Sequence, residues 1–392
     1  MRKEQFHIPE GTIYLDGNSL GPLPVAASAR VQQCVDEEWK NLLIAGWNEA
    51  GWYHQPRVLG NKLAPIIGAA DNTVVVGDTL SIKVYQALAA ALHLQPERRV
   101  ILSDSGNFPT DLYMAEGLIK SINNHLELKI VEPEAVADHL DNTVAVMMLT
   151  HVDYRTGRMH DMAHLTHIAH AHGAVALWDL AHSAGALPVD LTGCNPEFAV
   201  GCTYKYLNAG PGAPAFIYVR PDIADTVQPA LSGWMGHTAP FAFDPHYQPA
   251  PAIERMRIGT PPVLQMAALE AALEVWSDVS IKDIRQKSIE LSELFIEEVE
   301  KRCPQLTLAS PRDSTQRGSQ VSFRFNEGYA VIRALIEQGV IGDFRAPDIM
   351  RFGFTPLYID PPDVINAAII LEDIMRNNTW DNDRLKQRAA VT

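Results

Sequence analysis

The stretch "GCTYKYLNAGPG", residues 201–212, places Lys205 between two tyrosines at the end of a short apolar run. The run is typical of a strand, and the Gly and Pro residues after Lys205 indicate a turn. Most lysines are exposed to solvent and need no special setting. Whether Lys205 is an ordinary surface lysine depends on what the rest of the chain places at the neighbouring strand ends.

The composition of the chain is acidic. Its 392 residues include 32 Lys and Arg against 47 Asp and Glu, and the formal net charge is −15. This length is enough for a large core and two domains. Nucleic acids and anionic membranes are bound by clustered Lys and Arg, so the acidic balance argues against both as main partners. We interpret the negative charge as a contribution to solubility.

The cysteines and the N-terminus indicate an intracellular protein. The four cysteines are scattered and form no CxxC pair, which argues against a disulfide framework and a thiolate zinc site. The first residues, MRKEQFHIPEG, lack the apolar core of a signal peptide. No apolar run approaches the roughly 20 residues of a membrane span. We therefore expect a soluble, cytoplasmic protein with reduced cysteines.

Short apolar runs alternate with longer helical patterns, as in βα units wound around a mostly parallel sheet. The helical patterns include residues 81–94 and 109–123. The strand candidates are TVVVG (73–77), RRVILSD (98–104), VAVMMLT (144–150), AVALWD (174–179), FAVGCTY (198–204) and PAFIYV (214–219). The alternation predicts an α/β domain.

A second, smaller α+β domain is predicted at the C-terminus. A long, charged helical pattern runs from about residue 263 to about residue 302. The patterns that follow are typical of a strand, a helix and a strand: SQVSFRF (319–325), YAVIRALIEQG (329–339) and IMRFGF (349–354). We expect residues 50–262 to form the large domain, and residues 1–49 together with 263–392 to form the small one.

Two strand candidates are followed by side chains that suit a ligand, at the edge where open parallel sheets bind ligands. Asp78, Thr79 and Ser81 open the helix after the first strand, where free N–H groups can hold a phosphate. The same residue types are ordinary N-caps, so this signal alone is weak. Phe108 follows the second strand and could stack on a planar ligand, although a place in the core is the commoner reason for a Phe.

The next strand ends offer Thr150, Asp179 and His182. An aspartate at the end of an apolar run is costly to bury without a charged or hydrogen-bonding partner. Lys205 follows Asp179 by 26 residues (205 minus 179), one βαβ-scale connection, so both can point into one crevice. A cofactor with an aldehyde, a protonatable pyridine nitrogen and a phosphate would use the lysine, the aspartate and the helix N-terminus together. Pyridoxal phosphate is that cofactor.

Seven segments, which run from Ile13 to Tyr358, carry a family resemblance. They are IYLDGNSLGPLP (13–24), NFPTD (107–111), WDLAHSAG (178–185), YKYLNAGPG (204–212), SGWMGH (232–237), RIGTPP (257–262) and RFGFTPLY (351–358). The chain resembles kynureninase, a family of pyridoxal-phosphate (PLP) enzymes with the aspartate-aminotransferase fold. The resemblance implies the fold of type I PLP-dependent transferases, with a mostly parallel seven-stranded sheet in the large domain and a smaller α+β domain.

The resemblance also implies which residues bind the cofactor. Lys205 would bind the cofactor aldehyde covalently, and Asp179 would pair with the pyridine nitrogen. The other contacts would come from Leu80, Ser81 and the hydroxyl of Tyr204 at the phosphate, from Phe108 stacked on the ring, and from Thr150 and His182.

The implied reaction is hydrolysis of the Cβ–Cγ bond of L-kynurenine to anthranilate and L-alanine, as in tryptophan catabolism. Tyr204 would be the proton donor to the β-carbon. Arg351 would hold the substrate α-carboxylate, a planar anion that suits a bidentate guanidinium. Trp234 and Thr260 would reach the site from the neighbouring subunit of a homodimer.

Two other functions share part of this pattern. A cysteine desulfurase or selenocysteine lyase has the same lysine and aspartate, but usually a His before the lysine and a nucleophilic Cys late in the chain. Here Tyr204 precedes Lys205, and no cysteine follows Cys303. A non-catalytic sensor that binds PLP would normally carry a DNA-binding module, and the chain has neither a spare domain nor a basic patch.

Four histidines have a spacing that could align them on one helix face for a metal: His160, His164, His167 and His170. We expect a solvated helix face instead and no metal site, because the chemistry needs no metal.

Trp47 and Thr260 resemble the bacterial branch of the family. Animal enzymes, which favour 3-hydroxykynurenine, usually have a histidine at the position of Trp47 and an asparagine at that of Thr260. A phenolic hydroxyl on the aryl ring would have fewer partners here, so we expect L-kynurenine to be the better substrate. Trp52, five positions after Trp47, could serve in its place.

Overall fold

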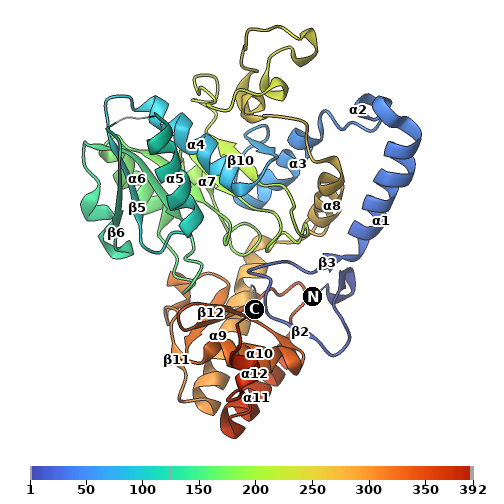
Figure 1. Ribbon diagram of the computed structural model, residues 1–392, viewed down its shortest axis with the longest axis vertical. Coiled ribbons are helices and arrows are strands. Elements are labelled where there is room, and N and C mark those ends of the chain that lie inside the picture. The colour runs from blue at the N-terminus through green and yellow to red at the C-terminus, as the bar shows by residue number, and fades with distance from the viewer. Residues whose placement is uncertain (1, 123–124, 389–392) are drawn as a thin grey trace.

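The computed structural model describes residues 2–122 and 125–388, which build a seven-stranded and a four-stranded sheet with flanking helices (Figure 1). The helices are α1 (Val25–Gln33), α2 (Gly46–Glu49), α3 (Gln55–Leu63), α4 (Leu80–Leu94), α5 (Pro109–Ile122), α6 (Met162–Ala171), α7 (Leu191–Cys194), α8 (Val263–Glu274), α9 (Ile281–Arg302), α10 (Gly328–Glu337), α11 (Pro361–Asn377) and α12 (Asp383–Lys386). A π-helical segment, Cys34–Leu42, follows α1. None of the helices in the described ranges is long and apolar enough to cross a membrane.

The large sheet has the strand order β4-β10-β9-β8-β7-β5-β6. Its strands are β4 (Val74–Val76), β5 (Val100–Asp104), β6 (Glu127–Val131), β7 (Val144–Thr150), β8 (Val175–Asp179), β9 (Phe198–Gly201) and β10 (Phe216–Val219). Only β10 runs against its neighbours, β4 and β9, so the prediction of a mostly parallel seven-stranded sheet is confirmed. The carboxyl ends of the other strands, β4 included, therefore meet at one edge.

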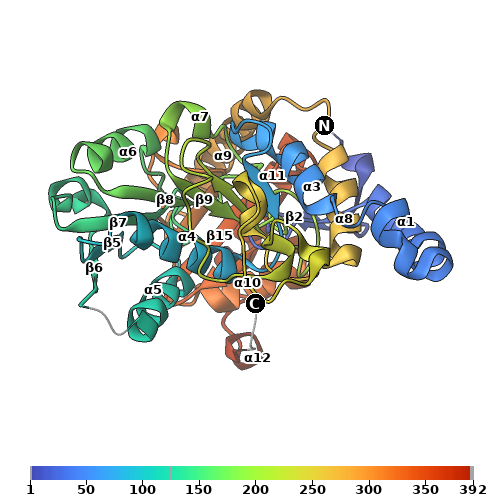
Figure 2. The same cartoon turned by 90° about the horizontal axis from the view of Figure 1, so that it is seen from above.

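Helices cover both faces of this sheet (Figure 2). Along β7, Val146 and Met148 pack with α4 and α5, whereas Met147 and Leu149 pack on the opposite face with α6. This alternation follows from the period of two along a strand. Because both faces are buried, the central strands are apolar at nearly every position, which explains their continuous apolar runs.

The six predicted strands are confirmed, and sequence reasoning missed β6. This strand lies at the sheet edge, and its residues are exposed or half-buried, so it lacks an apolar run. The predicted helix at 109–123 is α5, which ends at Ile122; residue 123 lies outside the described residues.

The prediction of one long helix over about 263–302 was wrong. The chain forms α8 and α9 with a turn between them. In this turn Trp276 is buried, and the side chain of Ser280 accepts a hydrogen bond from the N–H of Asp283 as the N-cap of α9. A buried aromatic followed by a new N-cap breaks the helix, although the helical periodicity resumes beyond it.

The small sheet is antiparallel, with the order β11-β12-β15-β14. Its strands are β11 (Thr307–Leu308), β12 (Gln320–Arg324), β14 (Asp343–Arg345) and β15 (Ile349–Gly353). The predicted strand, helix and strand over 319–354 are confirmed as β12, α10 and β15. The predicted domain boundaries at residues 49–50 and 262–263 stay a prediction.

The N-terminal segment forms two short strand pairings outside the four-stranded small sheet. The strands are β1 (Phe6–His7), β2 (Ile13–Tyr14), β3 (Leu23–Pro24) and β13 (Val340–Ile341). β1 pairs with β3, and β2 pairs in parallel with β13, which directly precedes β14. The segment that follows β2 therefore runs beside the small sheet, and Figure 1 shows α1 and α2 as an arm at the side of the molecule.

Candidate active site

Lys205 lies in the turn that follows β9, within reach of several predicted cofactor residues. Its Nζ atom lies 3.0 Å from Nε2 of His182. The same atom lies 6.0 Å from the ring centroid of Phe108 and 5.8 Å from that of Tyr204. The turn is tight, because Asn208 has a positive φ of 58° and its N–H donates to the carbonyl of Lys205. The Gly- and Pro-rich turn thus directs an ammonium group over the carboxyl edge of the sheet.

Asp179 ends β8 and is 4% exposed. It lies directly opposite Thr150, the last residue of β7, and Thr150 is also buried. The carboxylate accepts a hydrogen bond from the N–H of Ala181 at 2.9 Å. Burial raises the pKa of Asp179 to about 6, against the opposing effects of the Lys205 charge and this hydrogen bond. The group is therefore a carboxylate at neutral pH, in a setting poor in water.

His182 is a buried, neutral imidazole. Burial lowers its pKa well below the usual range, and the charges of Lys205 and Arg351 lower it further. Its Nδ1 atom is buried and has no hydrogen-bond partner among the described residues. Since buried polar atoms are rarely left unpaired, this atom marks a place where a ligand or water is expected.

Asp111 is a further buried carboxyl group near Asp179 and Lys205. It belongs to the segment NFPTD (107–111), but no role was predicted for it from the sequence. It lies in the first turn of α5 and is 2% exposed. Burial raises its pKa well above the usual range, and the charge of Asp179 raises it further, while Lys205 lowers it. The site therefore contains one carboxylate, Asp179, and one carboxyl group that favours the protonated form, Asp111.

The N-terminus of α4 opens at the same sheet edge. Thr79 is the N-cap, and its hydroxyl oxygen accepts from the N–H of Ile82. Leu80 and Ser81 form the first turn, and both are partly exposed. Asp78 forms an ion pair of 2.9 Å with the buried Lys83. The first turn of α4 thus has the free N–H groups that an anion would accept from.

Tyr204 is partly buried beside Lys205. Burial raises the pKa of its phenol, and the neighbouring Cys202 thiol raises it further. The hydroxyl is therefore protonated at neutral pH and can donate a proton or a hydrogen bond.

Arg351 lies in β15 and is 1% exposed. Its guanidinium forms an ion pair with Asp343 and donates to the carbonyl oxygen of Tyr154 and to the hydroxyl of Ser19. The ring of Tyr154 packs edge-on against Phe108, with centroids 5.1 Å apart. Arg351 is thus connected to Phe108, one of the predicted cofactor residues, through Tyr154 in the loop after β7. Sequence reasoning missed Ser19, Tyr154 and Asp343, which only the fold brings to Arg351.

Trp234, Thr260 and Trp47 are further predicted site residues that make no hydrogen bond or ring contact with Lys205 in the described part of the chain. The segments of Trp234 and Thr260 are side by side, because the N–H of Met235 donates to the carbonyl of Ile258. Trp234 is 39% exposed, and Thr260 is exposed. Trp47 lies in α2 and packs edge-on against Trp52.

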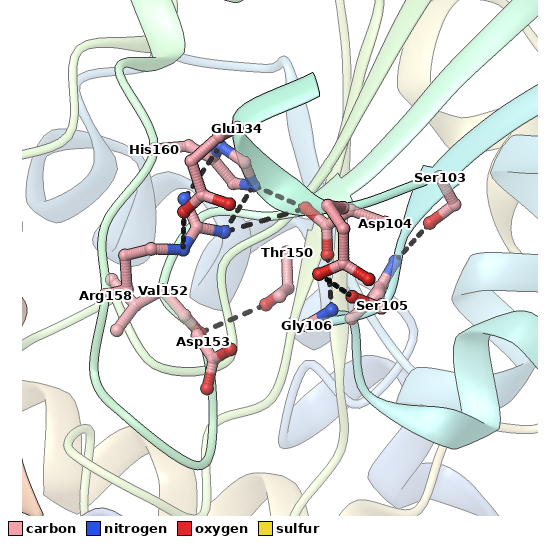
Figure 3. A network of polar contacts seen from close by, with 12 residues as sticks. Ser103, Asp104, Ser105, Gly106, Glu134, Thr150, Val152, Asp153, Arg158 and His160 are labelled. Carbon is pink, nitrogen blue, oxygen red and sulfur yellow. Dashed lines mark hydrogen bonds and ion pairs between the residues drawn. The ribbon is translucent and has the colours of Figure 1, made fainter. Parts of the chain in front are cut away.

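The four histidines do not line one helix face. His160 precedes α6 and is buried; its Nε2 lies 2.5 Å from a carboxylate oxygen of Asp104, beside Arg158 (Figure 3). His170 pairs with Glu197. In the described ranges, no group of three His, Cys, Asp or Glu could hold a metal ion. The predicted solvated face holds for His164 and His167, which are exposed, and is wrong for His160.

Comparison with known proteins identifies close relatives. The family described as "Kynureninase C-terminal domain" matches residues 284–371. Over 397 aligned positions, which include this whole chain and 95% of each relative, the chain is 52% identical to a kynureninase of Pseudomonas fluorescens and 51% identical to one of Burkholderia mallei.

Solved structures with the same fold are more distant in sequence. A cysteine desulfurase from Thermococcus onnurineus has a TM-score of 0.80 at 18% identity, over 96% of this chain and 97% of that one. A lysine-to-alanine variant of C-DES, with glycine covalently linked to its PLP cofactor, has a TM-score of 0.81 at 19% identity, over 95% and 99%. At such identities the likeness shows the fold alone.

Proposed function

The chain belongs to the kynureninase family, and on this premise we propose how its residues bind the cofactor and the substrate. It is a PLP-dependent hydrolase that cleaves the Cβ–Cγ bond of L-kynurenine with water, giving anthranilate and L-alanine. The observation that carries this function is the 52% identity with a kynureninase. The aligned region is the whole chain, so it includes the small sheet and Arg351. The test is to incubate the purified protein and PLP with L-kynurenine and to look for both products.

The residues at the carboxyl edge of the large sheet fit pyridoxal phosphate. Lys205 supplies an amine for the aldehyde, and the buried carboxylate of Asp179 is complementary to a protonated pyridine nitrogen. The first turn of α4, with Leu80 and Ser81, supplies N–H groups for the phosphate. The remaining contacts are assigned to Phe108, Thr150, His182 and Tyr204. When bound, the cofactor supplies an electron sink that stabilises negative charge beside the substrate amino group.

Two side chains handle the protons of the reaction. The Nζ atom of Lys205 takes the proton from the substrate α-carbon, and neutral His182 is positioned to accept a hydrogen bond from it. The phenol of Tyr204, which burial keeps protonated, gives the proton that the β-carbon needs to become the methyl group of alanine. Water supplies the oxygen that the aryl carbonyl carbon needs to become the carboxyl group of anthranilate.

A homodimer would complete each site with Trp234 and Thr260 of the partner. Both are exposed. Trp234 packs against Phe241, which is 56% exposed, and Phe241 packs against Phe243, which is 77% exposed. Exposed aromatic clusters of this kind mark protein interfaces. Among the described residues, no hydrogen bond or ring contact joins Trp234 or Thr260 to Lys205, which supports a site built from two subunits.

Mixing two inactive variants tests the shared site. We expect Lys205→Ala and Trp234→Ala homodimers each to have little activity. Hybrid dimers have one site with both residues intact, so an equal mixture that is dissociated and reassociated should regain about a quarter of wild-type activity. Mixtures that are never dissociated are the control. Recovery no greater than the mean of the two parents would place both residues in the same subunit's site and contradict the proposal.

The chain should prefer L-kynurenine to 3-hydroxykynurenine. Trp52 is buried and its indole N–H donates to Glu38, so Trp47 is the better candidate to reach a substrate. Trp47 and Thr260 offer a phenolic hydroxyl little to bond with, and an unpaired buried hydroxyl costs about 1–3 kcal/mol. We expect kcat/KM to be roughly five- to a hundredfold higher for L-kynurenine. Equal values for the two substrates would refute this, and Trp47→His with Thr260→Asn should narrow the gap.

A cytoplasmic location is part of the proposal. Cys34, Cys194, Cys202 and Cys303 are free thiols. Free thiols suit a reducing compartment, which supports the cytoplasm as the place where the protein acts.

A further inference from the structure

Asp343 and Arg351 form a buried ion pair across two neighbouring strands. They lie directly opposite each other in the antiparallel pair of β14 and β15, so their side chains share one face of the small sheet. Nε of Arg351 donates to Oδ1 of Asp343 at 2.6 Å, and NH2 donates to Oδ2 at 2.5 Å. Asp343 is 3% exposed and Arg351 is 1% exposed. The carboxylate thus occupies the inner edge of the guanidinium, formed by Nε and NH2.

The outer edge of the guanidinium, formed by NH1 and NH2, has only neutral partners. NH1 donates to the carbonyl oxygen of Tyr154 at 2.5 Å, and NH2 donates to the hydroxyl oxygen of Ser19 at 2.9 Å. A carboxylate presents two oxygens to two such nitrogens and bonds them more strongly than neutral acceptors do. A substrate carboxylate would therefore replace these two neutral acceptors at the outer edge.

Ser19 fixes this arrangement from the N-terminal segment. Its hydroxyl donates to Oδ2 of Asp343 at 2.5 Å and accepts from Arg351. The segment around Ser19 is held at both ends: the N–H of Gly353 donates to the carbonyl of Leu15, and the N–H of Gly21 donates to that of Tyr204. The segment therefore connects β15 directly to the turn that holds Lys205.

A side chain on Gly21 would not fit between these parts. A Cβ atom there would lie 2.4 Å from the carbonyl oxygen of Lys205, and one on Gly17 would lie 2.1 Å from the hydroxyl of Tyr358. The segment is thus packed tightly against both the small sheet and the Lys205 turn, and Ser19 has little freedom to move.

Asp343 carries the negative charge of this cluster. Although burial opposes ionisation, the guanidinium of Arg351 holds the pKa of Asp343 below its usual value. Arg345 lies 2.8 Å from the same carboxylate. The other nearby carboxyl group is Asp16, whose pKa is raised to about 7, first by burial and then by Asp343. Asp343 is therefore the counter-ion that orients Arg351 at neutral pH.

We propose that Asp343 is a positioning residue for the substrate α-carboxylate: it holds the inner edge of the Arg351 guanidinium, and Ser19 holds the Asp343 carboxylate, so that the outer edge faces the substrate. This inference rests on the proposed role of Arg351 as the carboxylate-binding residue. Asp343 itself touches neither substrate nor cofactor. It acts by keeping both outer N–H groups in the plane and direction that a carboxylate on a substrate bound at Lys205 requires.

The test compares ligands with and without a carboxylate. In Asp343→Asn, we expect KM for L-kynurenine and Kd for L-alanine to rise about ten- to a hundredfold, as for a lost charge-assisted hydrogen bond. kcat should change less than about threefold, and binding of the decarboxylated analogue of kynurenine less than about twofold. Asp222→Asn is the matched control, because Asp222 forms the same side-on pair with Arg220 at the surface. It should leave all four values unchanged.

The outcomes separate this inference from the proposed role of Arg351. If Asp343→Asn weakens ligands with and without a carboxylate equally, or weakens neither, Asp343 is structural and the inference fails. If Arg351→Ala shows no selective loss of carboxylate ligands, the assignment of Arg351 fails first. If Asp343→Asn does not fold, Ser19→Ala is measured in its place. We expect Ser19→Ala to weaken the binding of ligands with a carboxylate by about two- to fivefold, and the binding of the decarboxylated analogue less. Equal effects on both kinds of ligand would overturn the inference.

Discussion

Replacing Lys205 by alanine is expected to lower kcat/KM for L-kynurenine by at least about a thousandfold, because the variant loses both the amine that binds the cofactor aldehyde and the base at the α-carbon. The structure places this amine over the carboxyl edge of the large sheet, 3.0 Å from neutral His182. The variant should also fail to hold the cofactor covalently.

Borohydride reduction measures the covalent link separately from activity. Wild-type protein reduced with borohydride should gain the mass of one reduced cofactor on the peptide that contains Lys205, and Lys205→Ala should gain none. Lys205→Arg is the control for charge, since it keeps the cation but cannot form the link. A visible cofactor absorbance band and a borohydride adduct that persist unchanged in Lys205→Ala would contradict the assignment.

Replacing Arg351 by alanine is expected to lower kcat/KM for L-kynurenine by about a hundred- to a thousandfold, mostly through KM. A bidentate, charge-assisted contact with the substrate α-carboxylate is lost, in a place with little water to replace it. Cofactor affinity should change less than about threefold, because the cofactor residues lie on the large sheet, whereas Arg351 lies on β15 of the small one.

The control for Arg351→Ala is Arg324→Ala. Arg324 lies on the neighbouring strand β12, but its side chain is 55% exposed, so its loss should affect neither KM nor cofactor affinity. Thermal unfolding of both variants shows how much stability is lost when Asp343 loses a partner. An equal loss of substrate and cofactor binding in Arg351→Ala would show that Arg351 is structural.

The buried strands of the large sheet were predictable from the sequence, and its exposed edge strand, β6, was not. The central strands are covered on both faces, so they appear as continuous apolar runs such as VAVMMLT. β6, at the edge, includes the exposed Glu127 and has no such run. The turn between α8 and α9 was also missed, because the buried Trp276 continues the apolar pattern of a helix while the backbone leaves it.

The grouping of the proposed cofactor residues was predictable because they follow strands, and the fold gathers strand ends at one edge. The positions of Lys205, Asp179 and Phe108 at one edge could be predicted from two things: their order along the chain, and the rule that open sheets bind ligands at the carboxyl ends of their strands. Ser19 and Asp343 could not be found in this way. Ser19 reaches Arg351 because β2 pairs with β13, a strand far away in the sequence. Asp343 lies on β14, next to β15 in the sequence, but this three-residue strand has no periodic signal.

His160 shows how spacing alone can mislead. Its spacing from His164, His167 and His170 suits a helix face, but α6 begins at Met162, after His160. His160 instead bonds to the buried carboxylate of Asp104 at the end of β5, a contact between segments 56 residues apart. Only the packing of β5 beside β7 brings the two together.

The central claim is hydrolytic cleavage of L-kynurenine, and the fate of oxygen from water tests it most directly. The reaction is run with purified protein and PLP in water labelled with oxygen-18, and both products are measured by mass spectrometry. We predict equal amounts of anthranilate and L-alanine, with at least one labelled oxygen in the carboxyl group of anthranilate and no label incorporated by the reaction into alanine. Alanine without anthranilate, or anthranilate without the label, would contradict the account.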